Sequence, residues 1–187
     1  MITMKDFPPE DASIIRKVLE PVSFPLSEET RAKCLEMREY LVNSQDEEKA
    51  SRYGLRPGVG LAANQIGWDK QIFAVYIVDY DKETGEEEII LDEICINPKV
   101  ISHSVNKQAL REGEGCLSVP RDVPGFVPRS QRIRFEYYDL DGNKQELKLR
   151  GYPAIVCQHE LDHLRGHLFY DRINMEKPWD RTDLRLV

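Results

Sequence analysis

Apolar positions near the start of the chain repeat with a helical period. In Ser27–Gln45 they include Ala32, Leu35, Tyr40 and Leu41, and Ser27 is a residue type that caps helix N-termini. We therefore expect a long helix over Ser27–Gln45, which Glu47–Tyr53 could extend. Asp11–Glu20 predicts a shorter helix before it.

From residue 71 onward the period changes to two, which is typical of β-strands. Runs rich in Ile, Val, Phe and Tyr predict strands over Gln71–Tyr80, Glu87–Asn97, Lys99–Ser104, Gln131–Leu140 and Lys144–Arg150. The predicted turns between them are Thr84-Gly85, Asn97-Pro98 and Asp141-Gly142-Asn143. The last of these is the strongest hairpin signal in the chain.

A further helix is predicted over Gly151–Gly166, with Pro153 close to its start and Gly166 where it would stop. Helices first, antiparallel strands next and another helix after them indicate an α+β fold. We expect antiparallel β-sheets packed around this central helix, with the N-terminal helices beside them. The chain has 187 residues, 41% hydrophobic and 32% charged, which is the composition of one globular domain spanning residues 1–187.

Charge and cysteine usage restrict the function classes. The formal net charge of −7 argues against a duplex nucleic-acid partner, because that binding needs basic charge. The start of the chain lacks a positively charged segment followed by an apolar one, and the apolar run Ile72–Val78 is too short to cross a membrane, so we expect a cytoplasmic protein. The four cysteines, without CxxC pairing, fit a reducing compartment.

The sequence HELDH within the predicted central helix is an HExxH motif. At about 100° per residue, His159 and His163 lie on one face about one turn apart, so both imidazoles can reach one metal ion. Glu160 stands beside them, where a carboxylate can take a proton from a water activated by the metal. Asp162 is expected to support the site or to be solvated rather than to bind the ion. The alternative is a surface helix with two solvated histidines.

Apolar residues flank this motif on two sides of the helix. Those on the histidine stripe are Tyr152, Ile155 and Val156, and those opposite are Ala154, Cys157, Leu161 and Leu164. We therefore expect a buried helix with one side in the core and the other lining a site.

A catalytic site of this type needs a third protein ligand. Phe169 stands where a related metalloprotease signature has a third histidine, and His167 is two turns from His159, roughly 12 Å along the axis. Glu176 lies in a polar run near the end of the chain. Cys116, next to Gly115, is the preferred candidate, with burial as a small apolar residue as the alternative.

A glycine-bearing segment over Arg56–Gly67 lacks the Gly-Lys-Ser/Thr of a phosphate loop. Gly58 and Gly60 would permit a close backbone passage along a substrate, and Gln65 offers a side-chain amide donor. Alternatively, Leu61–Gln65 is simply a turn entering the sheet.

Three segments together resemble the motifs of the peptide deformylases: GVGLAANQ at Gly58–Gln65, EGCLS at Glu114–Ser118 and QHELDH at Gln158–His163. The long stretch between Gln65 and Cys116 resembles the longer subclass found mainly in Gram-positive bacteria. Near the N-terminus, only Ile15 and Arg16 fit the family's pattern.

The resemblance implies a metallohydrolase that removes the formyl group from N-formylmethionyl nascent polypeptides and releases formate. By this resemblance, Cys116, His159 and His163 would bind the metal, and Glu160 would act as general base and then acid. Gln65 and the backbone N–H of Leu117 would stabilise the oxyanion. The methionine side chain would occupy a pocket formed by Val59, Gly60, Tyr152, Ile155 and Val156.

The same resemblance favours one Fe²⁺ per chain, with Zn²⁺, Ni²⁺ or Co²⁺ as replacements. It also favours a monomer without membrane contact, with the ribosome surface as a candidate contact. Two other hypotheses follow from the motif alone: a zinc peptidase that cuts internal peptide bonds, and a catalytically silent domain with a structural metal site.

Overall fold

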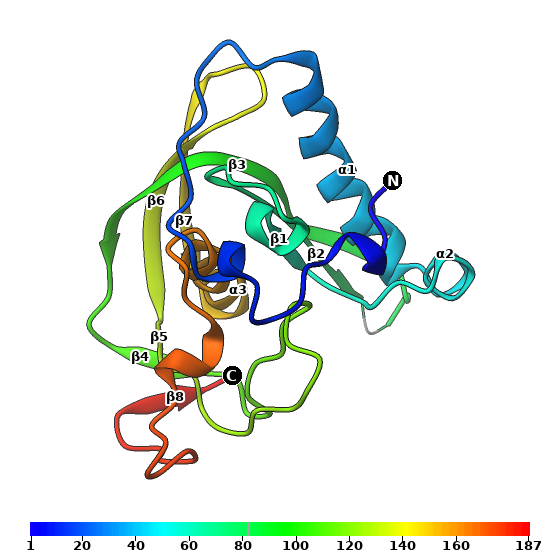
Figure 1. Ribbon diagram of the computed structural model, residues 1–187. Coiled ribbons are helices and arrows are strands. Elements are labelled where there is room, and N and C mark those ends of the chain that lie inside the picture. Colours follow the sequence, from blue (N-terminus) through cyan, green and yellow to red (C-terminus); the bar gives the residue numbers. More distant parts are fainter. Residues whose placement is uncertain (82) are drawn as a thin grey trace.

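The computed structural model of the chain describes residues 1–81 and 83–187. A five-stranded antiparallel sheet lies at its centre, with the strand order β1-β2-β3-β6-β7. Its strands are β1 (Gly60–Ala62), β2 (Ile72–Tyr80), β3 (Glu87–His103), β6 (Arg132–Tyr138) and β7 (Lys144–Arg150). Figure 1 shows the longest helices, α1 (Glu28–Gln45) and α3 (Gly151–His163), beside this sheet.

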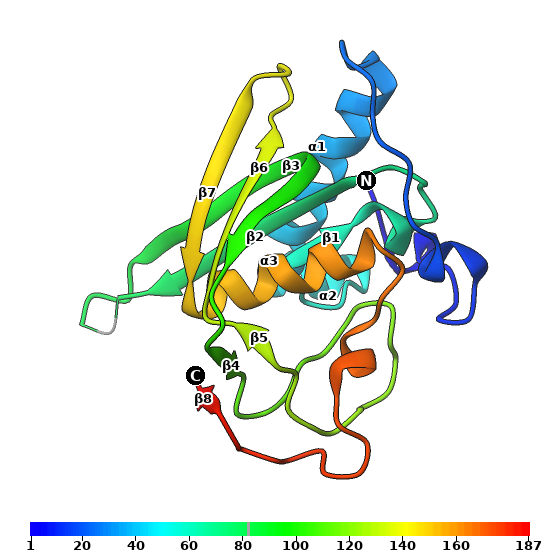
Figure 2. The ribbon, with the colours of Figure 1, turned by 90° about the vertical axis from the view of Figure 1, so that its left-hand side faces the viewer.

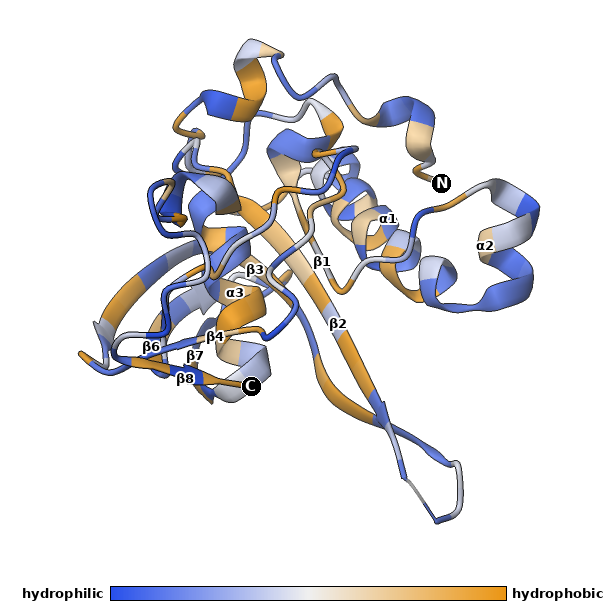
Figure 3. Ribbon diagram, turned by 90° about the horizontal axis from the view of Figure 1, so that it is seen from below, coloured by the Kyte–Doolittle hydropathy of each residue, from blue (hydrophilic) through white to orange (hydrophobic). Residues whose placement is uncertain are grey.

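Strand β2 is covered on both faces. All six residues of Ile72–Ile77 are buried, although neighbouring side chains of a strand point to opposite faces. Both α1 and α3 contact β2, and α3 crosses the sheet in Figure 2. Helix α3 is therefore enclosed by the fold, and the apolar colouring of β2 in Figure 3 follows the same burial.

A second, three-stranded sheet has the order β5-β4-β8. It consists of β5 (Arg129–Ser130), β4 (Lys107–Ala109) and β8 (Leu184–Leu186). Strand β8 pairs with β4 in parallel, which differs from the expectation of purely antiparallel sheets. In Figure 2 the C-terminal segment leaves α3, passes below it and returns to lie beside β4.

The α+β prediction is confirmed, and several elements match their predicted bounds. Helix α1 begins after Ser27, whose hydroxyl accepts a hydrogen bond from the N–H of Thr30 at 3.1 Å. Strands β6 and β7 form the predicted hairpin around Gly142, which has a φ of 80°. The segment Glu47–Tyr53 is a separate helix, α2, capped by Asp46, and not an extension of α1.

The predicted helix over Asp11–Glu20 is wrong. Only a 3-10 turn forms, over Ser13–Arg16. The rest of the segment pairs with the end of α3: Val18 forms a β-bridge with Arg165, and the N–H of Leu19 donates to the carbonyl of Leu164 at 3.0 Å. Tertiary backbone hydrogen bonds thus replace those of the expected helix.

The predicted turn at Asn97-Pro98 is also wrong, because β3 runs through it as one strand. Asn97 has a φ of 49° at an irregularity in the pairing with β6, and this break in the ladder accommodates Pro98, which lacks an N–H. The side chain of Asn97 exchanges two hydrogen bonds of 2.8 Å with the backbone of Val22. The turn signal therefore marks a bulge that anchors the N-terminal segment.

Candidate metal centre and its pocket

Helix α3 brings two imidazoles together on one face. The Nε2 atoms of His159 and His163 lie 3.2 Å apart, as their spacing of one helical turn predicts. The Sγ atom of Cys116, which comes from a distant loop, lies 3.3 Å from Nε2 of His163. The donor atoms of these three buried residues all lie within 4.8 Å of one another.

The donor set fits a metal ion. With metal–nitrogen bonds of about 2.0–2.1 Å and a metal–sulfur bond of about 2.3 Å, tetrahedral ligand atoms are separated by about 3.3–3.6 Å. The separations of 3.2 and 3.3 Å are close to these values. A thiolate and two imidazoles are ligands that Zn²⁺ and Fe²⁺ both accept.

The electrostatics favour an anionic sulfur. Burial by itself would raise the pKa of the Cys116 thiol, but the adjacent His163 and His159 lower it well below its usual value. Burial would likewise lower the pKa of His159, and its contacts with Cys116 and Glu114 raise it well above the usual value. A Cys116 thiolate and a His159 imidazolium thus stabilise one another.

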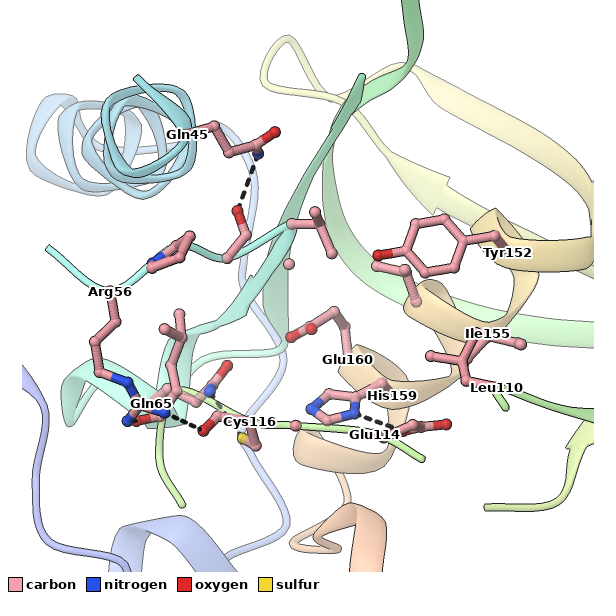
Figure 4. A pocket seen from close by; sticks show the side chains of 17 residues that line it. Gln45, Arg56, Gln65, Leu110, Glu114, Cys116, Tyr152, Ile155, His159 and Glu160 are labelled. Carbon is pink, nitrogen blue, oxygen red and sulfur yellow. Dashed lines mark hydrogen bonds and ion pairs between the residues drawn. The ribbon is translucent and has the colours of Figure 1, made fainter. Parts of the chain in front are cut away.

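A buried network of charged side chains contacts the Nδ1 side of the His159 ring. Its Nδ1 lies 2.9 Å from Oε2 of Glu114. Figure 4 marks this contact between the two side chains with a dashed line. Glu114 in turn accepts two hydrogen bonds, of 2.9 and 2.8 Å, from Arg129. Burial would raise the pKa of Glu114, but Arg129 and His159 lower it to about 2. Asp162 joins the network through Arg129 and Arg172, so its carboxylate contacts cations rather than the ligand atoms.

Glu160 is buried beside the three donor atoms. Its side chain faces Gly60, where a Cβ atom would lie 2.3 Å from Oε1, so only glycine leaves room for the carboxylate. Among the described residues, no hydrogen-bond partner reaches Oε2. Burial raises the pKa of this carboxyl to about 7. A carboxyl group with such a pKa can both accept and release a proton near neutral pH.

The glycine-bearing segment forms β1 and a 3-10 turn over Ala63–Ile66. Gln65 on this turn accepts from the N–H of Ala62 at 2.9 Å through its Oε1. That bond directs Nε2 toward Cys116 Sγ, at 3.4 Å, and toward Ser118 Oγ, at 3.2 Å. Leu61 and Ala62 thus lie in strand β1, and the turn that follows connects β1 to β2 and places Gln65 at the pocket.

The five predicted wall residues all line one pocket, together with Glu160, Gln65, Cys116, Leu117 and His159. Sequence reasoning missed four other lining residues: Gln45, Arg56, Pro57 and Leu110. It missed Glu114 and Arg129 as well. Glu114 stands within the quoted EGCLS motif, two positions before Cys116, and this spacing was the available signal.

The rejected ligand candidates lie elsewhere. Phe169 stands in the sequence where the metalloprotease signature has its third histidine. Its ring stacks on that of His159, with centroids 6.1 Å apart. The imidazole of His167 lies 3.8 Å from the carboxylate of Asp171. Cys157 is fully buried in the hydrophobic core. Helix α3 ends at His163, three residues before the predicted stop.

Comparison with known proteins agrees with this geometry. A sequence profile described as polypeptide deformylase matches residues 5–179. The chain belongs to the polypeptide deformylase family. It is 51% identical over 187 residues to the peptide deformylase of Latilactobacillus sakei, covering 100% of this chain and 99% of that protein. Peptide deformylase 2 of Bacillus cereus is 49% identical over 183 residues, covering 98% and 96%.

Solved structures give the same result. The crystal structure of peptide deformylase from Thermus thermophilus matches with a TM-score of 0.67 and 30% identity, covering 92% of this chain and 87% of that one. The structure from Ehrlichia chaffeensis matches with a TM-score of 0.69 and 30% identity, covering 92% and 89%. The resemblance inferred from three motifs is confirmed as family membership, and with it an enzyme of the peptide deformylase class.

In the part of the chain that the structure describes, no helix has both the length and the apolar character that crossing a bilayer requires.

Proposed function

We propose that this chain is a metal-dependent hydrolase that removes the N-terminal formyl group from the N-formylmethionine of newly synthesised polypeptides and releases formate. The observation that carries the proposal is the convergence of three donor atoms, on Cys116, His159 and His163, beside the buried carboxylate of Glu160. Membership of the polypeptide deformylase family supports the same reaction.

In this proposal Cys116, His159 and His163 hold one Fe²⁺ per chain, and Zn²⁺, Ni²⁺ or Co²⁺ can replace it. When bound, such an ion supplies a Lewis acid that makes water acidic and polarises the formyl oxygen. Glu114 keeps the His159 ring in the orientation that presents Nε2 to the ion.

Glu160 handles the proton. As general base it removes a proton from the attacking water, and as general acid it delivers that proton to the amine that leaves when the C–N bond breaks. Its pKa of about 7, raised by burial, suits both tasks. The products are formate and a polypeptide with a free amino-terminal methionine.

The developing negative charge on the formyl oxygen needs fixed donors. The amide of Gln65 is one, because its Oε1 is held by the N–H of Ala62 and its Nε2 faces the site. The backbone N–H of Leu117 is the second. Donors fixed before reaction lower the barrier because they require no reorganisation.

The methionine side chain occupies the apolar part of the pocket, formed by Val59, Gly60, Tyr152, Ile155 and Val156. Leu110 lines the same space, so we add it to this set. A flexible thioether chain fits an apolar cavity of mixed aliphatic and aromatic walls.

We further propose that residues 1–187 act as one catalytic domain and as a monomer in the cytoplasm, where formylated chains appear. The ribosome surface is the candidate contact, and neither duplex nucleic acid nor a membrane is required. Sedimentation of the purified protein with and without ribosomes tests both the oligomeric state and this contact.

The deciding experiment is a formate assay. Protein prepared without oxygen and loaded with Fe²⁺ or Ni²⁺, with metal content measured, is given a formyl-Met peptide and the same peptide without the formyl group. We expect formate and newly formed free amino termini in equal amounts from the first substrate, and no reaction with the second. No formate from protein with one metal per chain would refute the proposal.

Two variants separate the alternatives. Glu160→Gln should keep metal and fold while turnover falls about 10²- to 10⁴-fold, the range for a positioned proton-transfer group. A structural metal site would show no change in function from this substitution. Cys116→Ala should lose metal affinity and formate release together. If Cys116→Ala kept its metal and the protein cut internal peptide bonds without releasing formate, an internal peptidase of the HExxH type would be favoured.

A further inference from the structure

A cationic side chain lies behind the backbone proposed to carry the second oxyanion donor. The guanidinium of Arg56 donates to the carbonyl oxygen of Leu117 at 3.0 Å and to that of Cys116 at 3.4 Å. Figure 4 shows it extending from the glycine-bearing segment toward the backbone near Cys116. Arg56 is exposed, so these contacts serve the loop rather than the apolar core.

The hydrogen bond from Arg56 to the Cys116 carbonyl acts on the peptide group between Cys116 and Leu117. The carbonyl of Cys116 and the N–H of Leu117 belong to the same planar unit and, in a trans peptide, point in opposite directions. The N–H of Val119 also donates to this carbonyl, at 3.1 Å. Two donors therefore fix the orientation of the unit from its carbonyl edge, which leaves the N–H edge directed the other way.

The same contact changes the strength of that N–H as a donor. Hydrogen bonds in series polarise one another, so a carbonyl that accepts from a cation draws electron density away from the amide nitrogen. Guanidinium stays charged at every working pH. The effect of Arg56 on the Leu117 amide is therefore permanent.

We propose that Arg56 is a positioning residue for the reaction, which orients and polarises the Cys116–Leu117 peptide so that the Leu117 N–H meets the developing oxyanion as a stronger donor. This inference rests on the proposed function. Arg56 acts through the peptide and touches no reacting atom.

The main chain around Arg56 has anchors that do not involve its side chain. The hydroxyl of Tyr40 donates to the carbonyl of Arg56 at 2.9 Å. The amide of Gln45 donates to the carbonyl of Gly58 at 3.0 Å, and the N–H of Gly58 donates to Ser44 Oγ at 3.2 Å. Removal of the guanidinium should therefore leave the path of the glycine-bearing segment unchanged.

The test compares Arg56→Ala and Arg56→Lys with the wild type in the formate assay. In Arg56→Ala, kcat should fall about tenfold, less than the 10²- to 10³-fold loss of a whole oxyanion donor, with KM unchanged within about twofold. Arg56→Lys keeps a charge and should recover part of kcat. Arg52→Ala is the matched control, because Arg52 is exposed on α2 and stacks on Tyr53.

A second measurement is independent of turnover. It uses the NMR spectrum of Zn²⁺-loaded protein without substrate. The amide proton resonance of Leu117 should move upfield in Arg56→Ala, because loss of the hydrogen bond to the Cys116 carbonyl leaves the N–H of the same peptide less polarised. The resonance should stay in place in Arg52→Ala. A structural role alone would lower the thermal midpoint of the variant without this local shift.

The outcomes are distinguishable. A raised KM with unchanged kcat would overturn the inference and make Arg56 a substrate-binding residue. Wild-type kcat together with an unmoved Leu117 amide would also overturn it. If the wild type itself released no formate, the proposed function would fail, while the amide shift would still decide whether Arg56 polarises this peptide.

Discussion

The carboxylate of Glu114 lies 2.9 Å from Nδ1 of His159, and the opposite ring nitrogen of His159 lies 3.2 Å from that of His163. An imidazole that donates Nδ1–H to a carboxylate presents its Nε2 lone pair on the far side. One buried carboxylate thus determines which nitrogen of His159 is offered as a ligand.

Glu114→Gln should weaken metal binding. The neutral amide is a poorer acceptor for Nδ1–H, and loss of such a partner lowers metal affinity by about 10- to 100-fold. Competition with a chelator at fixed pH measures the change. Glu112→Gln, an exposed neighbour, is the control and should bind metal like the wild type. Equal affinity in both variants would contradict the assigned role of Glu114.

Gly60→Ala should reduce turnover without loss of metal. Its Cβ would lie 2.3 Å from Oε1 of Glu160, so the carboxylate must move, and a displaced base should lower kcat by about tenfold or more. In Gly58→Ala the new Cβ meets Leu117 Cδ1 at 2.9 Å, the flexible end of a side chain, so the loss should be smaller. Wild-type kcat in Gly60→Ala would show that the carboxylate is not confined by this glycine.

Arg129→Met should destabilise the fold strongly. Arg129 is 1% exposed, and its removal breaks its buried ion pairs with Glu114 and Asp162, although Glu114 still contacts His159 and Asp162 still contacts Arg172. Breaking a buried ion pair in this way costs about 3–5 kcal/mol. Urea unfolding at matched metal content measures it. Arg134→Met, which breaks an exposed pair with Glu146, should cost about 1 kcal/mol or less.

Gly166→Ala should cost more than Gly85→Ala, although both glycines have a φ of 73°. The positive φ alone penalises alanine by about 1–2 kcal/mol. Among the described residues, no atom lies within 4 Å of a Cβ at Gly85, whereas at Gly166 the Cβ would meet the carbonyl oxygen of Arg16 at 2.2 Å. The collision should add about 1–3 kcal/mol in urea unfolding. Equal losses would mean that the N-terminal segment moves away freely.

Periodicity and capping signals were enough to predict the helices and the hairpin whose backbone hydrogen bonds join residues close in sequence. Helix α1, the β6–β7 hairpin and helix α3 follow from local spacing and capping signals. The segments Asp11–Glu20 and Asn97-Pro98 were predicted wrongly because of distant partners. Backbone groups of the first pair with the end of α3, and the side chain of Asn97 bonds the backbone of Val22. Local patterns carry no information on such pairing.

The sequence by itself determined the pair of histidines and the glutamate between them, because a helical turn places residues four apart on one face. It also determined the family, through three ordered motifs. Only the tertiary structure brought Cys116 next to His163, buried Glu160 against Gly60 and set Arg56 behind the Leu117 peptide. These contacts join segments far apart in the chain, and their energies depend on burial and distance, which exist only in the folded protein.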